Sequence, residues 1–243
     1  MIKTIGIDAH QFHDHFSPTS SETPYPIIHG GEEEIRRRML VRHNRCAHPK
    51  TDKAKQLFEE YCGRVLIPDR IWWDTAHVIA LFSERPVLSN IFYAIRLKVE
   101  DDVREEAEKA LVLWLNTTWG LLTVLVNREE TRGRWTRLKM AQWRMLQVLD
   151  VRSLRADALK RLAEVFDRCA EKVPKRMPEQ FDPENPDPVR LEIDKGFVEV
   201  LNPSIDERAL EKSLVELYKR LNIAFKRWIV GTSKIEVHQV PRP

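Results

Sequence analysis

The apolar pattern of the chain changes character near residue 100, and this change constrains the fold more than any other feature. Before it, branched and aromatic residues gather in short segments at 64–67, 78–82 and 91–97. Such segments, separated by proline and charged residues, are typical of β-strands. After it, residues 101–126 place apolar side chains at helical spacing, behind two aspartates that suit a helix N-terminus. We therefore predict an α+β fold in which helices surround a small mixed or antiparallel sheet.

The C-terminal part of the chain is predicted to be helical on both sides of a proline-rich stretch. Apolar residues recur at intervals of three and four over 157–171, 189–201 and 206–229. Five prolines fall between Val173 and Val189, which favours an extended linker over 173–188. We expect an α+β domain over 1–172, this linker, and a C-terminal helical hairpin and tail over 189–243.

Composition limits the class of protein without fixing a function. The 243 residues include 40 basic and 37 acidic side chains, and the resulting net charge of +3 does not indicate a nucleic-acid binder. Three widely spaced cysteines argue against a disulfide framework and for a reducing compartment. The longest apolar stretch, residues 110–126, contains polar residues and is too short for a membrane span. We therefore expect a cytoplasmic protein that has no membrane partner.

A basic excess gathers between residues 128 and 144, where six basic residues stand against two acidic ones. The residues expected to contact DNA are Arg128, Thr131, Arg132, Gly133, Arg134, Trp135, Arg137, Lys139 and Arg144. Gly133 permits a tight turn, arginines reach phosphates or guanine edges, and a tryptophan can stack on a displaced base. The alternative is a solvated loop in which Trp135 and Trp143 simply pack.

Three strings in and around the basic segment follow one another in an order known from a family of DNA-modifying enzymes. They are LWLNTTWG at 113–120, NREETRGRWTRLK at 127–139 and LQVLDV at 146–151. Together they resemble the target-recognition region of adenine-specific DNA methyltransferases, in which a Leu-Asn-Ser/Thr step, a Thr-Arg-Gly turn and a Leu-Pro-Val element occur. Gln147 and Val148 depart from the last of these elements.

Further segments extend the resemblance in the same order over about residues 60–230. They are 62–64, 66–70, 75–80 and 86–90 upstream, and 188–190, 193–194 and 216–218 downstream. The resemblance implies a module that binds double-stranded DNA and reads a target sequence. It also implies a partner, which is the methyltransferase or nuclease catalytic subunit or domain of a restriction-modification system.

The resemblance does not include the catalytic motifs of these enzymes. We find no glycine-rich strand-to-helix loop for S-adenosylmethionine, and no Asn/Asp-Pro-Pro-aromatic tetrapeptide to hold a flipped adenine. The nearest string, Asn202-Pro203-Ser204-Ile205, lacks the second proline and the aromatic residue, and is typical of a helix stop followed by a helix start. S-adenosylmethionine is therefore expected on the catalytic partner and no cofactor on this chain, which we expect not to be catalytic alone.

Two clusters of possible zinc ligands point to a different class of protein. The first is His10, His13 and His15, and the second is His43, Cys46 and His48. Neutral imidazole and thiolate bind zinc, but neither cluster has zinc-finger spacing, so we assign no metal site. A metal-binding protein or metalloenzyme built on these clusters stays open as an alternative function.

Two other features allow both a structural and a functional interpretation. The arginines at 36–38, 42 and 45 could bind phosphate, although the glutamates at 32–34 favour salt bridges on one helix. The apolar stripe over 206–229 could serve as a docking surface, which keeps a helical protein-interaction module as a further alternative. No pattern in the sequence selects Asp69, Asp74 and His77 as a catalytic group.

Overall fold

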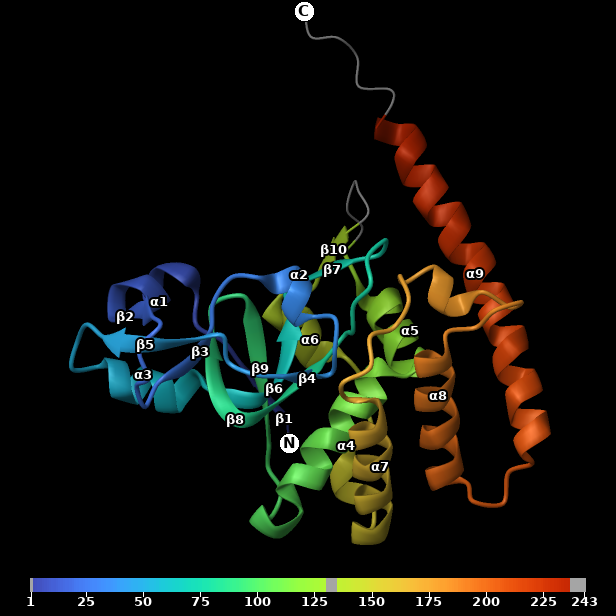
Figure 1. Cartoon of the computed structure of the whole chain (residues 1–243), viewed down its shortest axis with the longest axis horizontal. Coiled ribbons are helices and arrows are strands. Elements are labelled where there is room, and N and C mark those ends of the chain that lie inside the picture. The colour runs from blue at the N-terminus through green and yellow to red at the C-terminus, as the bar shows by residue number, and fades with distance from the viewer. Residues whose placement is uncertain (1, 130–134, 237–243) are drawn as a thin grey trace, which may run out of the picture.

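The computed structural model describes residues 2–129 and 135–236, and it describes side chains over 5–31, 33–129 and 135–226. Strands gather on one side of the molecule (Figure 1). The long helices α4 (Arg104–Asn116), α7 (Ala156–Cys169), α8 (Pro188–Leu201) and α9 (Glu207–Glu236) gather on the other. A mixed sheet with surrounding helices and a helical C-terminal section is the α+β fold that the sequence predicts.

One eight-stranded sheet makes up most of the β-structure. Its strands are β1 (Ile2–Ile5), β2 (Phe16–Thr19), β3 (Pro26–Ile28), β4 (Leu40–Val41), β5 (Arg45–Pro49), β6 (Gly63–Pro68), β8 (Leu81–Ser89) and β9 (Phe92–Leu97). The order is β1-β9-β6-β8-β3-β5-β2, and β4 pairs with β8 off this path. The sheet is mixed because β3 and β4 run parallel to β8 while the other pairs are antiparallel. Helix α4 packs against the central strands β6, β8 and β9.

The shorter helices connect or flank these strands. They are α1 (Ala9–His15), α2 (Glu32–Ile35), α3 (Ala54–Tyr61), α5 (Thr118–Asn127) and α6 (Met140–Met145), with 3-10 turns η1 (Asp101–Val103), η2 (Val151–Ser153) and η3 (Glu179–Phe181). Gly30 and Gly31 connect β3 to α2, and each has a φ angle of +67°, which glycine adopts without strain. This paired-glycine connection between a strand and a helix was not expected from the sequence.

The helical segment that follows the sheet is broken at Thr117, where α4 ends and α5 begins. The Thr117 side chain caps α5 by accepting a hydrogen bond from the backbone of Gly120 at 3.1 Å. A Cβ atom at Gly120 would stand 2.8 Å from the Cα atom of Leu115, so only glycine fits where α5 folds back against α4. Within residues 2–129 and 135–236 no single helix is long and apolar enough to cross a membrane, although the pair from η1 to α5, bent by 68°, would be.

The proline-rich stretch 173–188 is not the extended linker that we predicted from the sequence. Met177 and Phe181 within it are fully buried, and the backbone of Met177 donates a hydrogen bond to the carbonyl of Thr75 at 3.0 Å. The ring of Phe181 stacks on that of Phe225 in α9, with centroids 5.4 Å apart. The physical reason is that the apolar residues between the prolines fill the space between the sheet domain and the C-terminal helices. One hydrophobic core accordingly runs from Ile5 to Phe225.

Candidate nucleic-acid interface

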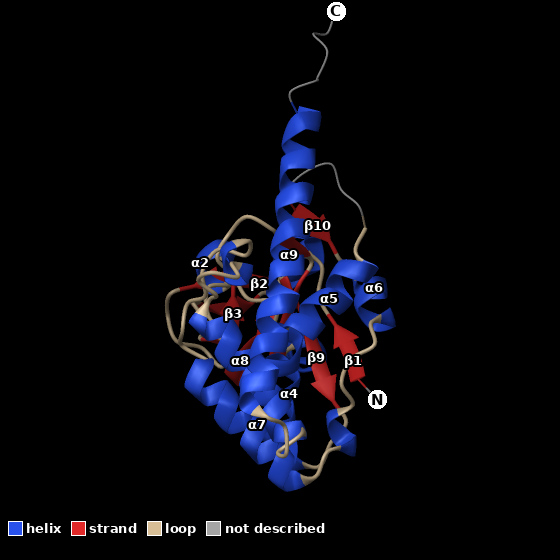
Figure 2. Ribbon diagram, turned by 90° about the vertical axis from the view of Figure 1, so that its right-hand side faces the viewer, coloured by secondary structure: helices blue, strands red, loops and turns tan. Residues whose placement is uncertain are grey.

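A separate two-stranded ribbon stands beside the main sheet. It consists of β7 (Arg70–Trp72) and β10 (Trp135–Arg137), which pair antiparallel with Arg70 opposite Arg137 and Trp72 opposite Trp135. Figures 1 and 2 both show β10 above the main sheet, on the side toward which α9 extends. The sequence did not predict this ribbon, because the segment around Gly133 was interpreted as a tight turn or a solvated loop.

The ribbon has one buried and one exposed face. Ile71 and Thr136, the central pair, are buried in the molecule. Because side chains alternate between the faces of a strand, the two pairs flanking them lie on the opposite side. We call this side the ribbon face, and it consists of Arg70, Trp72, Trp135 and Arg137. Trp72 has 39% of its surface exposed, an unusual position for so large an apolar side chain.

Side chains on the ribbon face contact one another across the two strands. The rings of Trp72 and Trp135 lie with their centroids 6.2 Å apart and their planes at 44°. The guanidinium carbon of Arg70 lies 5.6 Å from the centroid of the Trp135 ring, within the range of a cation–π contact. Arg137 forms an ion pair with Asp69, with 3.5 Å between Nη2 and Oδ2. Cations and aromatic rings are thus gathered on one small surface.

The base of the ribbon is fixed to the core by backbone and indole hydrogen bonds. Trp143 of α6 is buried and its Nε1 donates to the carbonyl of Pro68 at 2.8 Å, while the backbone of Leu138 donates to Asp69 at 2.9 Å. The Thr136 hydroxyl donates to the carbonyl of Glu129 at 2.7 Å. Of the two tryptophans in the basic segment, Trp143 therefore packs in the interior, as the structural interpretation predicted, and Trp135 lies on the ribbon face.

The other residues predicted to contact DNA fall into two groups. Thr131, Arg132, Gly133 and Arg134 lie outside the described residues. The rest are described: Arg128 donates to the carbonyl of Leu125, Lys139 lies 3.7 Å from Glu129, and the guanidinium of Arg144 lies 3.0 Å from the sulfur of Met140. Sequence reasoning missed Arg70 and Trp72, although the alternation Arg-Ile-Trp directly after the predicted strand at 64–67 was the signal that could have found them.

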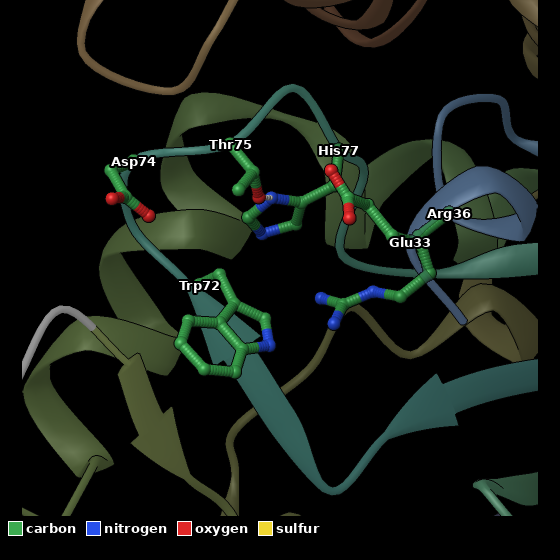
Figure 3. A pocket seen from close by; sticks show the side chains of 6 residues that line it. All are labelled: Glu33, Arg36, Trp72, Asp74, Thr75 and His77. Carbon is green, nitrogen blue, oxygen red and sulfur yellow. Dashed lines mark hydrogen bonds between the residues drawn. The ribbon is translucent and has the colours of Figure 1, made fainter. Parts of the chain in front are cut away.

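A pocket of about 440 Å³ opens beside the ribbon face. It is lined by Glu33, Arg36, Trp72, Asp74, Thr75 and His77, and Figure 3 shows these side chains converging on it. We call it the Trp72 pocket, since Trp72 belongs both to it and to the ribbon face. Arg36 also links the pocket to the ribbon face. It is only 2% exposed, and its Nη1 donates to the carbonyl of Arg70 at 2.6 Å.

His77 is also buried in this pocket, with 3% of its surface exposed. Burial, together with the nearby positive charge of Arg36, lowers the pKa of His77 well below its usual value, so the ring is neutral at pH 7. Its Nδ1 lies 2.9 Å from the hydroxyl of Thr75. Its Nε2 is buried and makes no hydrogen bond to any residue that the structure describes. In hydrolytic triads a carboxylate orients the second ring nitrogen, so the pair of Thr75 and His77 does not reproduce that arrangement.

The alternative candidate sites are dispersed in the structure. His15 lies 2.6 Å from the hydroxyl of Thr51, and the ring of His13 meets that of His29 edge-on at 5.7 Å. In the described part of the chain, no group of three His, Cys, Asp or Glu side chains is arranged to hold a metal ion. The arginines at 36–45 also point apart: Arg36 is buried, and Arg37 pairs with Glu34 at 3.2 Å, as the structural interpretation predicts.

No protein family, curated protein sequence or solved structure matches this chain. The functional argument therefore depends on the ribbon face and its surroundings.

Proposed function

We propose that this chain binds double-stranded DNA through the ribbon face, as the target-recognition module of a DNA adenine methyltransferase or restriction-modification system. The observation that carries the proposal is the pairing of β7 with β10, which places two exposed residues, Arg70 and Trp72, and two half-buried ones, Trp135 and Arg137, on one face of the ribbon. The catalytic subunit or domain of a methyltransferase or nuclease supplies catalysis, and S-adenosylmethionine binds there.

The shape of the ribbon suits this role, because the major groove of B-DNA admits a two-stranded β-ribbon. Arginine side chains on such a ribbon bind phosphate oxygens or form paired hydrogen bonds with guanine. The Arg137–Asp69 ion pair does not oppose this, because an exposed pair of this kind contributes only about 0–1 kcal/mol and is easily exchanged for a phosphate. Arg128 and Lys139 flank the ribbon in the sequence and add to its positive charge.

The exposed ring of Trp72 argues against the alternative that the ribbon face is an ordinary solvated surface. A large apolar ring left in water loses the free energy that its burial would contribute, about 1.5–3 kcal/mol for a side chain of this size class. Trp72 keeps part of this surface exposed next to Arg70 and Trp135. Aromatic rings and arginines together form the combination that stacks on bases and contacts the backbone of nucleic acid.

The test is the binding of a fluorescent duplex, measured by anisotropy between about 50 and 200 mM salt. We expect the affinity to fall with salt, and Arg70→Gln and Arg137→Gln each to make the logarithmic slope shallower by about one. Arg155→Gln is the matched control, since Arg155 is 87% exposed at the start of α7, away from the ribbon. Unchanged affinity and salt slope in the double ribbon variant, with the fold intact, would show that the ribbon face does not bind DNA.

A further inference from the structure

We propose that the Trp72 pocket binds a single unstacked nucleobase, and that the base comes from the nucleic acid held on the ribbon face. This inference rests on the proposed function, because the ribbon face delivers the base. The pocket has the size of a small-molecule site, since such sites have volumes of about 300–1,000 Å³ and this one measures about 440 Å³. Figure 3 shows the indole of Trp72 lying across the pocket from the imidazole of His77.

The Nε2 atom of His77 is the observation that most directly indicates a ligand. A buried polar atom without a partner costs about 1–3 kcal/mol, so a ligand that supplies a hydrogen bond here recovers that free energy. Because the ring is neutral, Nε2 is either one donor or one acceptor, depending on the tautomer. An apolar ligand would leave this atom unpaired, which argues for a ligand with hydrogen-bonding groups at its edge.

The charges of the pocket select a neutral ligand that both donates and accepts hydrogen bonds. Arg36 offers donors, whereas the carboxylates of Glu33 and Asp74 accept. The lining thus combines charges of both signs with the neutral ring of His77, rather than the cluster of cations that holds a phosphate. Each nucleobase presents donors and acceptors along its edge and a flat face that stacks on tryptophan. A nucleobase therefore matches the walls and the edge groups together.

The position of the pocket explains how a base would reach it. Trp72 lines the pocket and also belongs to the ribbon face, and Arg36 in the pocket holds the backbone carbonyl of Arg70 on the same strand. A base leaving the duplex at the ribbon needs only to pass the edge of Trp72. A base that is already unpaired reaches the pocket at a lower free-energy cost, because no base pair has to be broken.

The experiment compares two duplexes of one sequence, one fully paired and one with a single bulged base. We expect the wild-type protein to bind the bulged duplex about tenfold more tightly, consistent with base–aromatic stacking of about 1–3 kcal/mol. His77→Phe, and separately Thr75→Val in case the first variant fails to fold, should remove this preference while leaving the affinity and salt slope for the paired duplex unchanged. Arg70→Gln should weaken both duplexes and keep their ratio.

A second measurement identifies the source of the base and separates the two proposals. Adenosine, guanosine, cytidine and thymidine are each titrated without DNA while tryptophan fluorescence is followed. Nucleoside binding that His77→Phe abolishes, in a chain that binds no DNA, would keep the pocket and overturn the ribbon face. Equal binding of the paired and bulged duplexes by the wild-type protein, with no response to any nucleoside, would overturn the pocket and leave the ribbon face standing.

Discussion

Asn116 and Asp194 join the helices to the rest of the molecule through buried hydrogen bonds. The Asn116 amide accepts from the backbone of Ile79 at 2.7 Å and donates to the carbonyl of Ala80 at 2.8 Å. The Asp194 carboxylate of α8 accepts from the backbone of Thr118 at 2.7 Å and from the hydroxyl of Tyr218 at 2.6 Å. Asn116 and Thr118 at the junction of α4 and α5 therefore connect the segment before β8, the helices and the C-terminal section.

Removing the Tyr218 hydroxyl should destabilise the protein by about 1.5–3 kcal/mol, the scale of a hydrogen bond to a charged group. Burial raises the pKa of Asp194, and the hydrogen bond from Tyr218 is one of the contacts that oppose this rise. The folded Tyr218→Phe variant therefore stabilises the ionised Asp194 carboxylate less than wild type does. Its free energy of unfolding should fall further below that of wild type as the pH rises from 4 to 7. Urea unfolding at both pH values is the measurement.

Tyr25→Phe is the control for this variant. The ring of Tyr25 packs against Phe16 and Phe58, with centroids 6.2 and 5.3 Å away, in the N-terminal part of the sheet. We expect this change to cost less than about 0.5 kcal/mol. An equal loss in both variants would mean that the Tyr218 hydroxyl contributes no particular stability.

Glu108 should give the protein a measurable dependence of stability on pH. Burial raises the pKa of Glu108 to about 6, because the charge of Arg64, 3.4 Å away, offsets only part of the desolvation. The folded state then binds a proton more tightly than the unfolded state, so this group's contribution to stability falls as the pH rises from 4.5 to about 6. The difference between these pKa values corresponds to about 2 kcal/mol.

Glu108→Gln removes this titration. The stability of wild type relative to Glu108→Gln should therefore fall by about 2 kcal/mol between pH 4 and pH 7, as followed by urea unfolding. Two parallel curves over this range would show that Glu108 has an ordinary pKa in the folded protein.

At the scale of the elements, the turn η3 tests whether the proline-rich stretch 173–188 is packed into the core or is a linker. Phe181 is fully buried against Tyr218 and Phe225, so Phe181→Ala should destabilise the protein by about 3–5 kcal/mol. Val173→Ala, at an exposed position of the same stretch, should cost less than about 0.5 kcal/mol. Guanidinium unfolding distinguishes the two, and equally small effects would mean that the stretch is a linker after all.

Helices were the elements that the sequence predicted best. The segments expected at 157–171, 189–201 and 206–229 correspond to α7, α8 and α9. An amphipathic stripe repeats over several turns, so each helix carries its own signal. The strands at 64–67 and 91–97 were also confirmed, as β6 and β9, because branched residues mark them.

The N-terminal strands and the ribbon could not be predicted in the same way. The strand segments expected from the sequence lie at 64–67, 78–82 and 91–97, whereas β2, β3 and β5 lie within the first 50 residues and are each at most five residues long. β10 has three residues and only Thr136 faces inward, which leaves no alternation to detect. Its partner β7 lies more than sixty residues earlier, so the ribbon face exists only through a long-range pairing. The basic half of the site was visible in the sequence, whereas Arg70, Trp72 and the Trp72 pocket were not.

The whole molecule is built around one core that reaches from the sheet to the C-terminal helices, and a second cluster lies at Phe12, Phe16 and Ile27. The ribbon rests on the larger core through Ile71. A recognition surface on such a base keeps its side chains in register, which is what reading a sequence requires. In the proposed function, catalysis is supplied by another protein.

The paired glycines between β3 and α2 are relevant to whether this chain itself binds a cofactor, because many enzymes bind a cofactor at a glycine connection from strand to helix. Here, however, α2 has four residues and opens with the glutamates at 32–34, whose negative charge disfavours an anionic group at the helix N-terminus. Asn202-Pro203-Ser204-Ile205, the string nearest to a base-clamping tetrapeptide, lies in the connection between α8 and α9. Neither segment therefore favours a bound anionic cofactor or has the sequence of an Asn/Asp-Pro-Pro-aromatic tetrapeptide.

We therefore predict that the chain alone does not methylate DNA. Incubation with labelled S-adenosylmethionine and mixed-sequence duplexes should incorporate no more label than a heat-inactivated sample, while an active adenine methyltransferase labels the same DNA. The anisotropy titration on the same preparation is the necessary companion, since binding without transfer is what a recognition module should show. Label incorporated above the heat-inactivated level, and lost in Gly30→Val or Gly31→Val, would place a cofactor site at the β3–α2 connection and end the assignment of catalysis to a separate partner.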